Sequence, residues 1–287
     1  MPGAAARGER AKDGTARNKL PHGAGHTAFS ALRRRAYGSP VGRRRPKVTR
    51  STPGDPPAAL QWDLTRMTFR PKFVTFDCYG TLTDFDMAGA ARRVYGAELS
   101  EPAMTAFIEH FAAYRLDEVL GDWKPYAEVV HNAVERTCKR NGIAFRPEDA
   151  QRIYEEVPTW GPHPDVPAGL AKVAREIPLV ILSNAMNSQI MSNVEKLGAP
   201  FHAVFTAEQT GTYKPRMNGF EYMLDALGCG PEDITHVSSS FRYDLMTAYD
   251  LGIKSKVWVN RGHEPANPYY EYTEIKGVSG LPGVFGL

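Results

Sequence analysis

Short apolar runs that end in polar turns recur along the chain and indicate buried β-strands. The first is Phe73-Val74-Thr75-Phe76, which leads into Asp77 and a Gly-Thr turn. Apolar runs of roughly four to eight residues between turn signals are typical of strands that are covered on both faces. Four later segments have the same character: 179–183, 203–205, 235–238 and 256–260.

Segments with helical periodicity alternate with these strands, at residues 188–197, 216–227 and 243–251. Strands that alternate with helices through short loops predict a parallel sheet, because a parallel connection has to cross over the sheet. The expected fold class is therefore α/β, a doubly wound parallel sheet. In such sheets ligands bind at the carboxyl ends of the strands.

Residues 87–160 have a different pattern, with apolar side chains at three- and four-residue spacing and no strand signal. Phe107 and Phe111 illustrate this spacing, which predicts amphipathic helices. We therefore expect a helical unit inserted into an α/β core that consists of residues 67–86 and 161–287.

Both ends of the chain lack a sustained apolar period. Residues 1–66 are rich in Gly, Ala, Pro and Arg, and too few large apolar side chains are present to offset the entropy of ordering, so we expect a disordered basic extension. Its arginine runs at 33–35 and 43–45 leave open a targeting peptide or a nucleic-acid contact, and Met67 would make a natural start for a compact enzyme. Residues 264–287 are expected to form an irregular tail on the core.

Composition and charge narrow the class of protein. The three cysteines, Cys78, Cys138 and Cys229, have neither disulfide nor metal-ligand spacing, which favours a reducing, cytoplasmic location. No apolar run reaches the roughly 20 residues that cross a bilayer, so no membrane association is expected. The excess of positive charge is confined to the N-terminal extension, and the remainder gives no reason to expect a nucleic-acid partner.

Polar groups stand where the predicted strands end. Asp77 follows the first strand, Ser183-Asn184 ends the second, Lys214 opens a predicted helix, and Asp244 follows the strand at 235–238. Each has an ordinary explanation alone, since such residues are common in turns and at caps. Because the carboxyl ends of parallel strands share one edge of the sheet, we expect these groups to converge on one crevice.

The order and spacing of these residues resemble the four motifs of the haloacid dehalogenase superfamily. The similar segments are, in order, Asp77-Cys78-Tyr79-Gly80-Thr81-Leu82, Ser183-Asn184, Lys214-Pro215 and the stretch from Ser240 to Asp244. The resemblance covers about residues 70–262. It implies a Rossmann-like hydrolase core in which the helical insertion is a cap domain.

Two positions favour the dehalogenase branch of this superfamily. Its phosphatases carry an acid two residues after the nucleophile and paired acids in the fourth motif that hold Mg²⁺. Tyr79 and Tyr243 occupy these positions here. The motifs are similar instead to those of type II 2-haloacid dehalogenases, which implies hydrolytic release of halide from short 2-haloalkanoic acids with no metal and no organic cofactor.

The resemblance also implies a role for each catalytic residue. Asp77 would attack C2 of the substrate, displace the halide and form an ester. Lys214 would keep Asp77 ionised and oriented, since a nearby cation lowers the pKa of a carboxylate by about 1–3 units. Asp244 would activate or position the water that hydrolyses the ester. Ser183, with backbone N–H groups after the nucleophile, would hold the carboxylate of the substrate.

The other predicted site residues bind substrate or water. Asn184 would donate a hydrogen bond to the departing halide, and Ser240 would help to orient the water. Tyr79 and Thr81 complete the predicted substrate-binding set. Tyr79 could alternatively only fill the seam between core and cap.

Two departures from the family pattern concern the leaving group. The family carries an Arg on the first long cap helix that meets the halide, but an ungapped alignment puts His110 at that position. Arg115, in the same helix, is the best substitute, although it could equally be an exposed residue paired with Asp117 or Glu118. Phe241 stands where some relatives have a water-binding Asn.

Alternative functions stay open at this stage. The main rival is a superfamily hydrolase with another leaving group, such as a phosphate ester or a C–N bond. A second rival is a non-catalytic relative that binds a small acid or a protein. The expected partner is a small-molecule 2-haloacid, and relatives often form homodimers through the cap.

Overall fold

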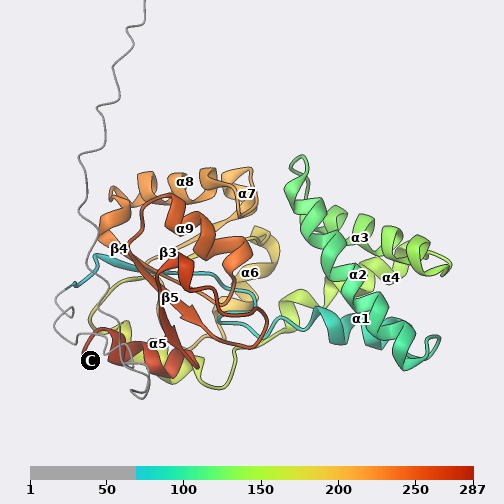
Figure 1. The fold of residues 1–287 in the computed structure, drawn as a ribbon, viewed down its shortest axis with the longest axis horizontal. Coiled ribbons are helices and arrows are strands. Elements are labelled where there is room, and N and C mark those ends of the chain that lie inside the picture. The colour runs from blue at the N-terminus through green and yellow to red at the C-terminus, as the bar shows by residue number, and fades with distance from the viewer. Residues whose placement is uncertain (1–68) are drawn as a thin grey trace, which may run out of the picture. The chain divides into compact units, whose positions relative to one another are not determined.

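The computed structural model describes residues 69–287, so the predicted extension at 1–66 lies outside the described residues. Its centre is a six-stranded sheet with the strand order β3-β2-β1-β4-β5-β6, in which every pair of neighbours is parallel (Figure 1). The strands are β1 (Phe73–Phe76), β2 (Leu179–Ser183), β3 (Ala203–Thr206), β4 (Ile234–Ser238), β5 (Ser255–Val259) and β6 (Thr273–Ile275). The predicted doubly wound parallel sheet is confirmed.

Helices cover both faces of the sheet, as the apolar runs of the strands require. Side chains of β2 alternate between the faces, so that Ile181 packs toward α5, α6 and α10 while Val180 and Leu182 pack toward α8 and α9. These helices are α5 (Val166–Val173), α6 (Asn187–Val194), α8 (Met217–Leu227), α9 (Met246–Asp250) and α10 (Leu281–Val284). With β1 between β2 and β4, the residue after it, Asp77, is flanked by strands on both sides and is buried.

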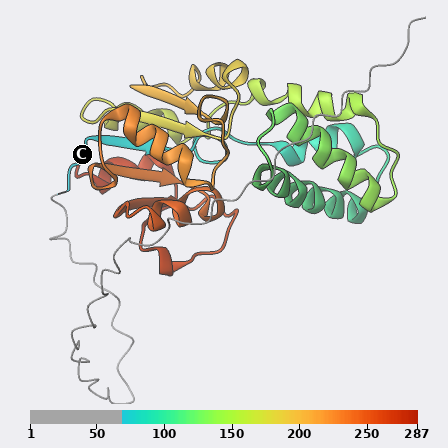
Figure 2. The same ribbon diagram turned by 90° about the horizontal axis from the view of Figure 1, so that it is seen from above.

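The segment between β1 and β2 contains a separate group of helices (Figure 2). It consists of α1 (Met87–Tyr95), α2 (Glu101–Leu120), α3 (Tyr126–Asn141), α4 (Pro147–Glu155) and the short η2 (Val157–Thr159). Their apolar faces form one cluster that includes Phe107 and Phe111. Gly96, Gly121 and Gly142 follow the ends of α1, α2 and α3, as glycine often does at the C-termini of helices.

Two parts of the core differ from the sequence-based expectation. Residues 264–287 are not wholly irregular, because they add the edge strand β6 and the helix α10. The helix α5 was not predicted, since Pro167 and Gly169 weaken its helical signal. Gly169 has a packing reason, because a Cβ there would lie 2.4 Å from the carbonyl oxygen of Val278. The C-terminal segment therefore rests directly on α5.

Within residues 69–287, no helix has both the length and the apolar content that crossing a membrane requires.

Candidate active site

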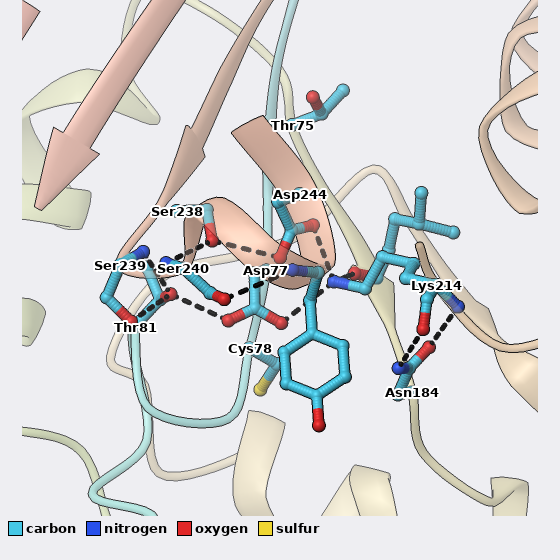
Figure 3. A network of polar contacts seen from close by, with 12 residues as sticks. Thr75, Asp77, Cys78, Thr81, Asn184, Lys214, Ser238, Ser239, Ser240 and Asp244 are labelled. Atoms are coloured by element: carbon cyan, nitrogen blue, oxygen red, sulfur yellow. Dashed lines mark hydrogen bonds and ion pairs between the residues drawn. The ribbon is translucent and has the colours of Figure 1, made fainter. Parts of the chain in front are cut away.

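The strand ends that the sequence singled out meet at one edge of the sheet. Asp77 follows β1, Ser183 ends β2 and Ser238 ends β4, and these three strands are neighbours. Lys214 enters from the loop between α7 (Ala207–Thr210) and α8. Figure 3 shows the Lys214 side chain extended toward Asp77 and Asp244.

The ammonium group of Lys214 joins the two carboxylates. Its Nζ lies 2.9 Å from Asp77 Oδ1, 2.7 Å from Asp244 Oδ1 and 2.9 Å from the carbonyl oxygen of Leu182. An ammonium has three N–H groups, so these three acceptors use all of them. Since Lys214 is only 2% exposed, its position is fixed.

Burial and charge move the pKa values of the two carboxyl groups in opposite directions. Burial raises the pKa of Asp77, and Lys214 only partly offsets this. Burial also acts to raise the pKa of Asp244, but Lys214 and a hydrogen bond from His236 outweigh it and hold that pKa below its ordinary value. Burial opposes the charge of Lys214, yet the two carboxylates raise its pKa above its usual range. Asp77 is therefore the more basic, and as an anion the more nucleophilic, of the two carboxylates.

Thr81 fixes the second oxygen of Asp77. Its hydroxyl donates to Asp77 Oδ2 at 2.7 Å and accepts from the backbone N–H of Ser239 at 2.8 Å. Thr81 is fully buried and does not line the cavity described below, so its contact is with the nucleophile candidate.

Asn184 and Ser183 lie side by side with different surroundings. Asn184 Oδ1 accepts from the backbone N–H of Lys214 at 2.7 Å, and its amide donates to the Lys214 carbonyl at 3.0 Å. Ser183 Oγ is buried and has no partner among residues 69–287. Buried hydroxyl groups are rarely left unbonded, so this one, which lines the cavity, suits a ligand.

Asp244 is held from three sides and lies behind Lys214. Its Oδ1 is 3.1 Å from His236 Nε2, and its Oδ2 accepts from Ser238 Oγ at 3.0 Å. Sequence reasoning did not find His236. The available signal was its place in β4 two residues before Ser238, which puts both side chains on the same face of the sheet.

Ser240 lies on the cavity wall but bonds away from Asp244. Its hydroxyl donates to Glu264 Oε1 at 2.7 Å and accepts from the backbone N–H of Tyr243 at 3.2 Å. Glu264 Oε2 also accepts from the backbone N–H of Phe241 at 3.0 Å. Ser240 thus ties the turn after β4 to the loop after β5, and Ser238 is the serine that contacts Asp244.

A cavity of about 770 Å³ opens above these groups. Asp77, Ser183 and Lys214 are among the residues that line it, together with Phe85, Leu116 and Val119 from the side of the helical insertion. The wall is thus mainly apolar, and a few polar groups converge at one place, as in small-molecule sites.

Arg115 lines this cavity, and its guanidinium group makes no ion pair with any residue in the described part of the chain. The guanidinium carbon is 5.3 Å from the ring centre of Phe85 and 5.0 Å from that of Phe111, and Nη1 is 3.4 Å from the hydroxyl of Tyr126. Its Nε is buried without a partner among the described residues.

The acids near Arg115 in sequence pair elsewhere. Asp117 binds Arg136, and Glu118 binds Lys124 and Arg136. The alternative of a surface ion pair for Arg115 is therefore wrong. His110, at the position of the family Arg, is 3.1 Å from the side-chain nitrogen of Asn141.

Tyr79 belongs to both the cavity wall and the seam between core and insertion. Its hydroxyl donates to Asn193 Oδ1 at 2.9 Å, and its ring centre is 5.4 Å from that of Phe85. The two predicted roles of Tyr79, substrate binding and filling of the seam, are compatible, because the seam forms part of the cavity wall.

The site does not fit a divalent cation. The carboxylates of Asp77 and Asp244 already share the ammonium of Lys214, and tyrosines stand at 79 and 243. Among residues 69–287, no group of three His, Cys, Asp or Glu side chains could hold a metal ion.

The comparisons with known proteins agree with this geometry. A family model for haloacid dehalogenase-like hydrolases matches residues 71–252, and the chain belongs to that family. It is 27% identical over 192 residues to haloacetate dehalogenase H-2 of Moraxella sp. (strain B), covering 66% of this chain and 85% of that protein. It is also 27% identical over 99 residues to human N-acylneuraminate-9-phosphatase, covering 34% of this chain and 40% of that protein.

A solved structure has the same fold. The L-2-haloacid dehalogenase from Xanthobacter autotrophicus with chloropropionic acid covalently bound aligns with a TM-score of 0.61 and 21% identity. The alignment covers 75% of this chain and 98% of that one.

Proposed function

We propose that the protein hydrolyses short 2-haloalkanoic acids to 2-hydroxy acids through an ester on Asp77. The observation that carries this proposal is the position of Asp77, held between Lys214 and Thr81 at the cavity, with Tyr79 where an acid would protonate a leaving oxygen. Halide is a weak base and leaves without a proton, whereas an alkoxide leaving group gains from a general acid. The haloacetate dehalogenase among the relatives supports the same choice.

In the first half of the reaction, a carboxylate oxygen of Asp77 attacks C2 of the substrate. The new C–O bond forms as the carbon–halogen bond breaks, and the halide takes the bonding electrons. Lys214 and Thr81 fix the carboxylate, so little reorientation is needed before attack.

In the second half, water attacks the carbonyl carbon of the ester. The alkyl C–O bond stays intact, the hydroxy acid leaves, and the carboxylate of Asp77 is restored. One proton of the water passes to Asp244 and then to solvent, and the other ends on the departing oxygen, which becomes the hydroxyl group of the product. This assignment rests on the carboxylate of Asp244, whose lowered pKa favours the anion and whose Oδ1 lies 2.7 Å from Lys214 Nζ.

Ser183 and Arg115 supply the open contacts for the substrate. The Ser183 hydroxyl and backbone N–H groups after Asp77 would bind the substrate carboxylate. Arg115 would receive the halide, since its guanidinium sits over aromatic rings with an unused N–H. The second hydrogen of the Asn184 amide, which the Lys214 carbonyl does not use, would assist there. In this scheme residues 87–160 act as the cap that excludes water.

The test is halide release from chloroacetate, 2-chloropropionate and fluoroacetate without added metal. A generic phosphate ester with Mg²⁺ is assayed in parallel, because a phosphatase is among the relatives. Halide release supports the proposal, and phosphate release without halide release overturns it. A single turnover in H₂¹⁸O adds a sharper criterion, since the product of an ester mechanism carries its new oxygen from Asp77 and not from the solvent.

A further inference from the structure

His236 occupies the middle of β4 and is completely buried. Its Nδ1 is 2.8 Å from Thr75 Oγ1 on β1, and its Nε2 is 3.1 Å from Asp244 Oδ1. The ring of Phe220 packs against it edge-on at 5.0 Å. An imidazole in an apolar strand is thus bonded at both nitrogens, and one of its partners is a carboxylate of the proposed site.

The contacts fix which nitrogen carries the proton. The Thr75 hydroxyl has one hydrogen, and His236 Nδ1 at 2.8 Å is a better acceptor position than the carbonyl of Thr235 at 3.4 Å. With Nδ1 accepting, the ring hydrogen lies on Nε2 and is donated to Asp244.

The Nε2 hydrogen of His236 occupies one of the acceptor positions of the Asp244 carboxylate. A carboxylate accepts about four hydrogen bonds, and Lys214, His236 and Ser238 take three of these positions. The fourth position has no donor among the described residues. Asp77, in contrast, is held by Lys214 and Thr81 and does not contact His236.

We propose that His236 is a positioning residue that fixes the carboxylate of Asp244 for hydrolysis of the ester, through the Nε2 hydrogen that Thr75 directs toward it. The inference rests on the proposed function, because it assigns His236 to the second half of that reaction. Loss of this donor leaves Asp244 held by Lys214 and Ser238 alone, while the contacts of Asp77 stay in place. Ester formation then continues and ester hydrolysis slows.

The experiment measures halide release by rapid quench in the full chain, using whichever haloacid the wild type turns over. His236→Phe should retain a first-turnover burst of halide, while its steady-state rate falls by at least about tenfold. The trapped ester should appear in the intact protein mass. His236→Gln places an amide N–H near the position of Nε2 and should restore most of the steady-state rate.

Thr75→Val provides a second variant that keeps the imidazole. It removes the hydroxyl that selects the tautomer and should give the same pattern, a retained burst with a smaller loss of steady-state rate. The idea is overturned if the variants that fold, as judged by circular dichroism, match the wild type or lose burst and steady-state rate equally. A wild type that releases no halide would count against the proposed function instead.

Discussion

Lys214, Asp77 and Asp244 form what can be called the floor of the cavity, and Ser183 and Arg115 belong to its wall. The two regions differ in whether their polar groups have hydrogen-bond partners. On the floor, Lys214 donates all three N–H groups to fixed acceptors, and each carboxylate accepts hydrogen bonds from more than one donor. On the wall, Ser183 Oγ and Arg115 Nε are buried without partners among the described residues. In the proposed function, the floor is organised before the substrate arrives, whereas the wall still has open contacts for its anionic groups. Reactivity and recognition are therefore assigned to different groups.

The strongest test of the floor is Asp77→Asn. The amide keeps the size of the side chain but is no nucleophile, so halide release should fall by roughly 10⁴-fold or more. Steady-state halide release, with circular dichroism as a check on folding, measures this. A variant that folds and keeps substantial activity would exclude Asp77 as the nucleophile.

Lys214→Met should lower the stability of the protein as well as its activity. It leaves two buried carboxylates without their shared cation, and removing one partner of a buried ion pair costs about 3–5 kcal/mol. Urea unfolding should show that loss at neutral pH, and a smaller loss at acidic pH, where a carboxyl group is protonated. Unchanged unfolding would mean that the three groups are less tightly coupled than their distances indicate.

Arg115→Met should affect the wall without disturbing the floor. We expect kcat/KM for haloacids to fall by about 10- to 100-fold, because a charge-assisted contact to an anion is lost. The free energy of unfolding should change by less than about 1 kcal/mol, since the contacts removed are those with two aromatic rings and a long hydrogen bond to the Tyr126 hydroxyl. Arg140→Met, on α3, is the matched control, because Arg140 is exposed and bonds only to the Tyr114 hydroxyl.

The pH profile provides the mildest test. Asp77 reacts as an anion, and burial raises its pKa above the ordinary 3.8. Activity should therefore fall as pH decreases through a value above 3.8, and Asp244, with its lowered pKa, should not set that limit. The measurement is kcat/KM against pH in buffers of constant ionic strength. A loss of activity only at or below pH 3.8 would show that Lys214 lowers the pKa of Asp77 more than burial raises it.

The sequence was informative where structure is decided locally. An apolar run followed by a polar residue identifies a buried strand and its end, so Asp77, Ser183 and the strands of the core could be predicted. The short edge strand β6 could not, because three residues with exposed Thr273 and Glu274 give no periodic signal.

Residues whose role depends on distant contacts were harder to interpret. The two readings of Arg115 could be separated only once Arg136 and Lys124 were seen to hold the neighbouring acids. His236 gave only a weak signal, its place in β4 two residues before Ser238, because its partners Thr75 and Asp244 come from other elements. Ser238 and Ser240 are of the same residue type and lie two positions apart, and only their three-dimensional surroundings distinguish them.

The loop after β5 has a consequence for altering selectivity. It supplies part of the cavity wall, and the carboxylate of Glu264 anchors it to the turn at Ser240 and Phe241. None of the groups that hold Asp77 comes from this loop. Substitutions in this loop could therefore admit bulkier acids without changing Asp77, Lys214 or Thr81.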